Sequence, residues 1–256
     1  MGDFARDTQV VGSAGQFAAE LNEDWNIWGP NGGYLSAIAL RAVGACATIP
    51  RPVAIYGHYL RVARFASVEI AVEPLSQGRR TESFAVRIHQ ENKLIFAGMV
   101  RTARAADGLE YAEGSAPDVP APAALPTAES LWTAAHGTRR PFWQNFDVRV
   151  IIPERFELPR PALPAHWLEW YRFRGEADYR DPFLDAGRSL VLLDTMTWPA
   201  VSLRHPKSAF IAPSLDIAAW FHQPAHDEAW LLAEARSAIG HGGTLSADMR
   251  VWSERG

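Results

Sequence analysis

Residues 28–42 have the sequence WGPNGGYLSAIALRA, in which a turn rich in Gly, Pro and Asn leads directly into a helical segment. Arg41 is the only charged residue between Asn31 and Ala47. A helix at the surface of a protein carries a polar face opposite its apolar stripe, and this segment has no such face. We therefore expect a helix that is covered on all sides, and a sheet is the expected cover because strands follow it.

Four segments after this helix alternate apolar and polar residues, which is typical of half-buried strands. They are residues 55–61, 67–75, 81–90 and 94–102. Short polar breaks at residues 77–79 and 91–93 suit hairpin turns. A further strand begins at residue 16, upstream of the helix. The predicted order is therefore strand, buried helix and four strands.

The composition changes after residue 104. Residues 105–130 are rich in Ala, Pro and acidic residues, and the prolines at 117, 120, 122 and 126 exclude a regular helix or a central strand. We predict a linker there, between an N-terminal unit at residues 1–104 and a C-terminal unit at residues 131–256.

The second unit repeats the pattern of the first. We predict strands at residues 142–151 and 167–174, a helix that begins at Asp181-Pro182, and strands from Ser214 onward. Asp suits the N-cap of that helix and Pro suits its first position.

The two units can also be aligned residue by residue, which predicts a tandem duplication. Matched pairs lie 162 or 163 positions apart: Tyr59 with Phe221, Gly78 with Gly240, Thr81 with Thr244, and Arg87 with Arg250. In this frame Lys93 matches Gly256, so the strand at residues 94–102 has no counterpart in the second unit. An unfilled position in a sheet leaves backbone groups unpaired, so we expect a C-terminal tail, another segment or a partner to fill it.

Composition excludes several classes of protein. The chain has 256 residues, of which 48% are hydrophobic and 21% are charged, as in a globular enzyme. Its net charge of −4 provides no basic field for nucleic acid. Neither an apolar run of about 20 residues nor a signal peptide is present, so we expect no membrane partner and a cytoplasmic location. The single cysteine, Cys46, and the eight histidines show no metal-ligand spacing, so no metal site is predicted.

Three motifs together resemble the thioesterase-like superfamily that includes acyl-CoA thioesterase II. They are GPNGGY at residues 29–34, HYLR at residues 58–61, and PSLD at residues 213–216 leading to WFH at residues 220–222. The resemblance covers almost the whole chain except the linker. It implies an α+β fold, a double hot-dog, in which two tandem units each have a long helix wrapped by a curved antiparallel sheet.

The same resemblance implies a chemistry. Members hydrolyse acyl-CoA thioesters with an Asp, a Ser or Thr, and a Gln that jointly hold and activate a water, without cofactor or metal. The Asp corresponds to Asp194 and the Ser or Thr to Ser214. The Gln normally lies on the last strand of the second unit, the strand without a counterpart here, so no residue is assigned to that role.

The residues themselves also single out Asp194, which directly follows the apolar run Leu190 to Leu193. An unpaired charge there would be costly, so this carboxylate needs either hydrogen-bond donors or a catalytic role. As a general base it would gain from burial, which raises its pKa. Ser214 is predicted on a strand, where its hydroxyl either orients the water or bonds the strand end. No Gly-x-Ser-x-Gly motif surrounds it, so it is not predicted to be a nucleophile.

Backbone donors and cations complete the predicted site. Asn31, Gly32 and Gly33 begin the buried helix, where free N–H groups suit the oxyanion of a thioester, although a tight turn without a ligand explains them too. Arg61, Arg79 and Arg80 are candidates for binding CoA phosphates, and the alternative is solvated surface charge.

We therefore predict a thioester hydrolase with acyl-CoA as substrate. One alternative is a hot-dog acyl-CoA hydratase or dehydratase. The double hot-dog members of that class resemble one another in an Asp followed five positions later by a His, whereas here Pro199 follows Asp194 at that distance. The other alternative is a non-catalytic acyl-CoA-binding protein. Hot-dog units leave apolar faces or edges, so we also expect a homo-oligomer.

Overall fold

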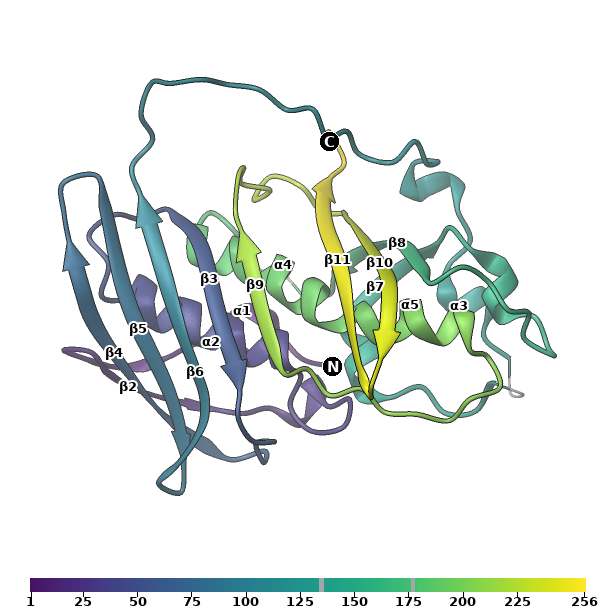
Figure 1. Cartoon of the computed structure of the whole chain (residues 1–256), viewed down its shortest axis with the longest axis horizontal. Helices are drawn as coiled ribbons and strands as arrows, with labels where there is room; N and C mark the ends of the chain where they lie inside the picture. Colours follow the sequence, from purple (N-terminus) through teal and green to yellow (C-terminus); the bar gives the residue numbers. More distant parts are fainter. Residues whose placement is uncertain (134–135, 176–177) are drawn as a thin grey trace.

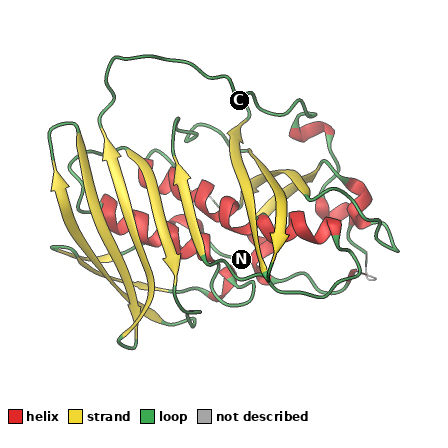
Figure 2. Ribbon diagram, in the orientation of Figure 1, coloured by secondary structure: helices red, strands yellow, loops and turns green. Residues whose placement is uncertain are grey.

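The computed structural model describes residues 1–133, 136–175 and 178–256. Helices α2 (Gly32–Gly44) and α4 (Pro182–Thr195) lie in the middle of the molecule, and antiparallel strands curve around them (Figures 1 and 2). This is the wrapped-helix arrangement that the sequence predicted. No helix in the described part of the chain is long and apolar enough to cross a membrane.

The strands form two sheets. The larger has the order β1 (Val11–Ser13), β2 (Gln16–Glu20), β4 (Ser67–Gln77), β5 (Thr81–Gln90), β6 (Lys93–Ala103), β3 (Pro52–Tyr59) and β9 (Asp216–Trp220). The smaller has the order β11 (Thr244–Ser253), β10 (Leu231–His241), β8 (His166–Phe173) and β7 (Phe146–Val150). Strand β9 belongs to the second half of the chain but pairs with β3 of the first, so the two halves share a sheet.

Shorter helices connect these elements. The α-helices are α1 (Phe4–Asp7), α3 (Ala128–Leu131) and α5 (Thr197–Arg204), and the 3₁₀ turns are η1 (Glu23–Trp25), η2 (Pro122–Ala124), η4 (Pro141–Asn145) and η5 (Pro153–Phe156). In Figure 1 the chain after β6 crosses the molecule as a loop before it reaches the second half.

Helix α2 is buried along most of its length, as its sequence requires. Ten of its thirteen residues are buried. The side-chain oxygen of Asn31 caps it by accepting a hydrogen bond from the Tyr34 N–H at 2.9 Å. The one charged residue, Arg41, reaches the edge of the core, where its guanidinium donates to the Ala5 carbonyl at 2.6 Å. The apolar helix and its single charge are thus both accommodated.

Helices α2 and α4 are antiparallel and pack at unusually close range. The start of α2 lies against the end of α4, where a Cβ added at Gly33 would be 2.3 Å from the Leu190 carbonyl oxygen. At the other end, a Cβ at Gly44 would be 2.7 Å from the Phe183 ring. Only glycine allows the two backbones to approach in this way. The contact brings the N-terminus of α2 next to the C-terminal turn of α4.

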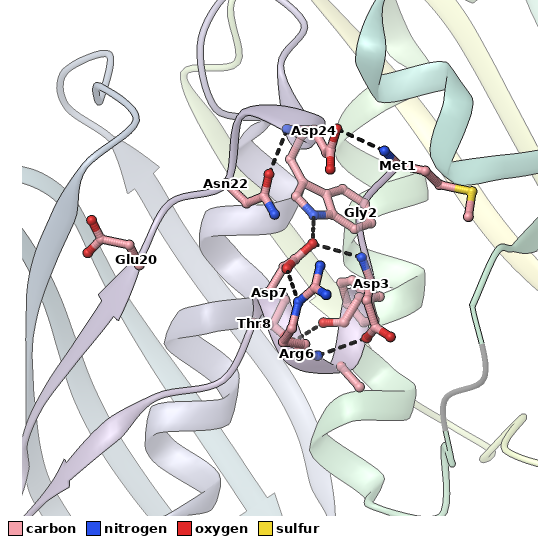
Figure 3. Close-up of polar contacts among 12 residues, drawn as sticks. Met1, Gly2, Asp3, Arg6, Asp7, Thr8, Glu20, Asn22 and Asp24 are labelled. Carbon is pink, nitrogen blue, oxygen red and sulfur yellow. Dashed lines mark hydrogen bonds and ion pairs between the residues drawn. The ribbon is translucent and has the colours of Figure 1, made fainter.

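The N-terminus of the chain also ties the two halves together. The Asp7 carboxylate accepts hydrogen bonds from the Trp25 indole at 3.1 Å and from the Asp3 N–H at 2.8 Å (Figure 3). The Gly2 N–H donates to the side-chain oxygen of Asn145, in the second half, at 2.8 Å. Asn145 is buried and returns a hydrogen bond to the first half, from its Nδ2 to the Asp24 carbonyl at 2.8 Å.

Three sequence-based boundaries need correction. The strand predicted at residues 142–151 begins only at Phe146, because the Pro141 segment forms the 3₁₀ turn η4. Ser214 lies in the loop before β9, since that strand begins at Asp216. The linker predicted at residues 105–130 has no regular element at residues 105–121, but the short helical segments η2 and α3 form near its end, with Pro122 tolerated in the first turn of η2.

Candidate functional site

A large groove runs between the two helical ends and the strands of the second half. Its volume is about 3360 Å³. The N-terminus of α2, the C-terminal turn of α4, the loop before β9, and strands β9 and β11 all contribute to its lining. Of the residues that the sequence singled out, it contains Asn31, Gly32, Arg61, Asp194 and Ser214.

Asp194 lies in the last turn of α4, facing the N-terminus of α2. Its Oδ2 accepts a hydrogen bond from the Asn31 Nδ2 at 2.9 Å. Its Oδ1 is buried and has no hydrogen-bond partner among the described residues. One carboxylate oxygen therefore accepts a hydrogen bond from Asn31, and the other is buried with donors near it but none in hydrogen-bond geometry.

Burial dominates the electrostatics of this carboxylate and raises the pKa of Asp194 above its ordinary value. The Ser214 hydroxyl, the Gly33 and Gly32 N–H groups and the Tyr59 hydroxyl oppose the rise in pKa by favouring the charged form. The sequence predicted that burial would raise this pKa. Perturbed carboxyls in grooves are good candidates for acid–base chemistry.

The side chain of Asn31 has no spare hydrogen for a substrate. Its Nδ2 donates to Asp194 and also to the Thr195 Oγ1 at 3.0 Å, while its Oδ1 caps α2 through Tyr34. Thr195 in turn donates to the Val191 carbonyl at 2.6 Å. Asn31 therefore connects the start of α2 to the end of α4.

Tyr59 belongs to the site, although the sequence reasoning gave it no role. Its hydroxyl shares a 2.7 Å hydrogen bond with Ser36 of α2. Burial, followed by the nearby charge of Asp194, raises the pKa of Tyr59 well above its usual value, so it stays protonated. Its place in the HYLR motif was the available signal, because Tyr59, Leu60 and Arg61 of that motif all line the groove.

Gly32 preserves space beside the free oxygen of Asp194. A Cβ at Gly32 would lie 2.7 Å from the Asp194 Oδ1 and 2.8 Å from the Tyr59 ring. Any larger residue would press on the carboxylate and the ring together. Gly33 instead allows the close contact between α2 and α4, so the two adjacent glycines have different structural roles.

The predicted cations divide into two places. Arg61 lines the groove, and its guanidinium donates to the Leu94 carbonyl at 2.7 Å. Arg79 and Arg80 line a separate depression beside Arg104, at the β4–β5 turn. Only Arg61 therefore lies on the groove that holds Asp194.

Aromatic residues form part of the groove wall. Trp198 and Trp220 line it, and the Trp198 ring packs edge-on to Trp28 with centroids 5.6 Å apart. Trp230 lies elsewhere, stacked with Arg172 at 5.1 Å. Within the described ranges no cluster of three metal-ligating side chains occurs.

The sequence on both sides of this groove matches known family models. Residues 21–103 match the model of the acyl-CoA thioesterase N-terminal domain, and residues 115–256 match that of the C-terminal domain. The chain belongs to the acyl-CoA thioesterase family. It is accordingly a thioester hydrolase. The comparison with curated proteins found no match.

Solved structures of similar fold include a hot-dog protein of unknown function from Alicyclobacillus acidocaldarius. It is 22% identical, with a TM-score of 0.84 over 99% of this chain and 92% of that one. A putative thioesterase II from Thermobifida fusca is 21% identical, with a TM-score of 0.79 over 100% and 93% of the two chains. An acyl-CoA thioesterase II from Mycobacterium marinum is 19% identical, with a TM-score of 0.79 over 99% and 93%. These likenesses confirm the double hot-dog fold.

Proposed function

We propose that this acyl-CoA thioesterase hydrolyses its substrate with a water held between Asp194 and Ser214, releasing a free acid and CoA. The observation that carries the proposal is the state of the Asp194 carboxylate. Asn31 holds its Oδ2, while its buried Oδ1 lies beside Gly32 without a hydrogen-bond partner in the described structure. Such an oxygen suits a general base that accepts a proton from water.

In this mechanism Asp194 removes a proton from the water as its oxygen attacks the thioester carbonyl. The raised pKa of Asp194 strengthens it as a base once it is ionised. The Ser214 hydroxyl, which also favours the ionised form of Asp194, orients the water. Collapse of the tetrahedral intermediate then breaks the carbon–sulfur bond and expels the CoA thiolate, which takes up the proton that Asp194 had accepted from the water.

Backbone N–H groups are proposed to stabilise the oxyanion. Of the first N–H groups of α2, that of Tyr34 bonds to the Asn31 side chain and that of Leu35 to the Asn31 carbonyl. The N–H groups of Gly32 and Gly33 remain for the Asp194 carboxylate and for the thioester oxygen. Asn31 contributes through its hold on Asp194, because its backbone N–H donates to the Trp25 carbonyl at 3.0 Å and both of its side-chain amide hydrogens are engaged.

Arg61 is the proposed contact for a CoA phosphate, since it is the predicted cation that lines the groove. Arg79 and Arg80 would require CoA to extend to the separate depression at the β4–β5 turn. Arg61→Gln should therefore raise KM for acyl-CoA while leaving kcat nearly unchanged, and Arg79→Gln provides the matched comparison.

The proposal is tested by adding acyl-CoA to the purified protein and following free thiol. Release of CoA thiol with formation of the free acid supports hydrolysis. Loss of enoyl-CoA absorbance without thiol release would indicate the hydratase alternative. Thermal stabilisation by acyl-CoA without turnover would indicate a binding protein, and either of these results would overturn the proposal.

We also propose that the protein acts as a cytoplasmic homo-oligomer in lipid metabolism. The outer face of the larger sheet supports the assembly, because Tyr56, Met99 and Trp220 are 46%, 49% and 59% exposed on neighbouring strands. The rings of Tyr56 and Trp220 pack against each other with centroids 5.7 Å apart. Light scattering should give a mass above that of one chain, and Tyr56→Lys should reduce it; a monomeric mass would contradict the assembly.

A further inference from the structure

Tyr59 and Ser36 form a pair of hydroxyl groups beside Asp194. Ser36 lies on α2, one turn after Gly32, and is fully buried. Tyr59 is the last residue of β3. The two hydroxyl oxygens are 2.7 Å apart, and either of them can be the donor. The direction of this hydrogen bond decides where the Tyr59 hydrogen points.

The Ser36 hydroxyl does not make the hydrogen bond that hydroxyls in helices often make. Ser and Thr side chains in helices can donate to the carbonyl four residues back. Thr195 of α4 does so, since its Oγ1 donates to the Val191 carbonyl at 2.6 Å. In the described structure the partner of Ser36 Oγ is instead the Tyr59 hydroxyl alone. The Ser36 hydrogen is therefore available for Tyr59.

Tyr59 also lies close to the unpartnered oxygen of Asp194. The Tyr59 Cζ and the Asp194 Oδ1 are 2.8 Å and 2.7 Å from the point where a Cβ at Gly32 would lie, so both border the same small space. Oδ1 is buried and has no hydrogen-bond partner in the described structure. Hydrogen bonds to an ionised carboxylate are stronger than those between neutral groups. Oδ1 is thus a strong acceptor within reach of the Tyr59 side chain.

Both hydroxyl hydrogens can be paired in only one of the two directions. If Tyr59 donates to Ser36, the Ser36 hydrogen stays unpaired in a buried place, which is costly. If Ser36 donates to Tyr59, the Tyr59 hydrogen is left for Asp194 Oδ1, and each hydrogen has an acceptor. Successive hydrogen bonds that end on a charged oxygen also strengthen one another.

The electrostatics around Tyr59 favour the same direction. Burial, followed by the nearby charge of Asp194, holds the pKa of Tyr59 well above its usual value, so Tyr59 keeps a hydrogen to donate. The carboxylate of Asp216 on β9 acts on Tyr59 in the same sense. The other groups that face Asp194 are neutral donors: the Asn31 amide, the first N–H groups of α2 and the Ser214 hydroxyl.

We propose that Ser36 donates its hydrogen to Tyr59 and that Tyr59 donates to Asp194 Oδ1, which makes Tyr59 a positioning residue for this carboxylate. Tyr59 keeps its proton throughout, because the arrangement involves hydrogen bonds alone. A second lone pair of Oδ1 stays available to the water. By favouring the ionised carboxylate, Tyr59 lets Asp194 act as a base at lower pH than burial alone would allow. This consequence for catalysis rests on the proposed role of Asp194.

The test measures the protonation of Asp194 directly in the full chain. The carbon-13 signal of its carboxyl group is followed by NMR across pH and is assigned by its loss in Asp194→Asn. Tyr59→Phe keeps the ring but removes the hydroxyl, so the titration midpoint should move to higher pH by about 0.5 or more. Tyr56→Phe, at an exposed ring on the same strand, is the matched control and should leave the midpoint in place.

Ser36→Ala separates the two directions of the hydrogen bond. In the proposed direction Tyr59 already donates to Asp194, so the midpoint should stay in place or move to slightly higher pH. In the opposite direction the substitution would free the Tyr59 hydrogen for Asp194, and the midpoint would move to lower pH. A lower midpoint in Ser36→Ala, or an unchanged midpoint in folded Tyr59→Phe, would overturn the proposal.

Single-turnover release of thiol across pH connects this arrangement to catalysis. In Tyr59→Phe the pH of half-maximal rate should rise together with the NMR midpoint. If Asp194 were not the base, Asp194→Asn would release thiol at the wild-type rate although the NMR midpoint of Tyr59→Phe still moves. If Tyr59 did not donate to Asp194, that midpoint would stay fixed although Asp194→Asn is slow. The two failures are therefore distinguishable.

Discussion

The Asp194 carboxylate, whose Oδ1 is buried without a hydrogen-bond partner in the described structure, is costly for stability. Its pKa is raised in the folded protein, so the folded state holds this proton more tightly than the unfolded state does. Its contribution to stability is therefore greatest at acid pH, below the unfolded pKa of an aspartate, and is lost as the pH rises through the raised value.

Asp194→Asn should consequently stabilise the protein relative to the wild type above the raised pKa, with the gain disappearing at lower pH. Urea denaturation at several pH values measures this difference. The exposed carboxylate of Asp216, at the same groove, provides the control Asp216→Asn, which should show a smaller change. A stability difference independent of pH would contradict the assigned burial of Asp194.

Asn31 combines a structural and a functional contact, and two substitutions separate them. Asn31→Ser keeps an N-cap oxygen for α2 but loses the bond to Asp194, so it should retain stability and lose about 10- to 100-fold in kcat. Asn31→Ala loses both contacts and should cost about 0.5–2 kcal/mol of stability as well. Steady-state kinetics and thermal denaturation give the two readouts; full activity in Asn31→Ser would exclude the positioning role.

The sequence predicts Asp194 and Ser214 as site residues, but not the contact that joins Asp194 to the start of α2. An acidic residue beside Leu193 can be recognised in the sequence, because burying a charge next to apolar residues is costly unless it has hydrogen-bond partners. That Asn31 lies 2.9 Å from Asp194 depends on how two helices pack, which no local pattern contains. For the same reason Tyr59 was left without a role.

At the element scale, the approach of α2 and α4 decides where the site forms. Gly33→Ala should destabilise the protein by about 1–3 kcal/mol, because its Cβ would meet the Leu190 and Val191 backbones and the helices would have to separate. Gly→Ala inside a helix usually stabilises a protein by about 0.5–1 kcal/mol. A destabilised Gly33→Ala variant would therefore indicate the close contact between the two helices.

Gly240→Ala in β10 is the matched control, since a Cβ there meets its nearest neighbour at an ordinary 3.7 Å. Thermal or urea denaturation compares the two variants. Equal stability of Gly33→Ala and Gly240→Ala would show that the helices do not pack as described.

Elements with a regular alternation of apolar and polar residues could be predicted from the sequence. Elements that depend on tertiary contacts could not. The strand predicted at residues 81–90 coincides with β5, and Asp181 caps α4 as expected. The 3₁₀ turn η4 occupies residues 142–145 of the strand predicted at 142–151, and there Phe142 is buried against Trp25 with ring centroids 6.2 Å apart.

At the scale of the whole molecule, the two halves should unfold together. They share β9, the contact between α2 and α4, and the hydrogen bonds of Asn145. Asn145→Ala leaves the Gly2 N–H and the Asp24 carbonyl without their partner, which should cost about 2 kcal/mol or more. Gln223→Ala, on an exposed loop, is the control.

Urea unfolding followed by tryptophan fluorescence and by circular dichroism tests this coupling. One shared transition, shifted to lower urea in Asn145→Ala, is expected. Two separated transitions in the wild type would mean that the halves are independent. The sequence predicted two tandem units, but it gave no indication that a strand of the second unit completes the sheet of the first.

The proposed role of Asp194 is to activate the water that cleaves the thioester. The most direct measurement is the single-turnover release of free thiol from acyl-CoA by the wild type and by Asp194→Asn, across pH. The wild-type rate should rise with pH through the raised pKa of Asp194, and the variant should be folded yet slower by about 10²- to 10⁴-fold. An Asp194→Asn protein that releases thiol at the wild-type rate would contradict the account.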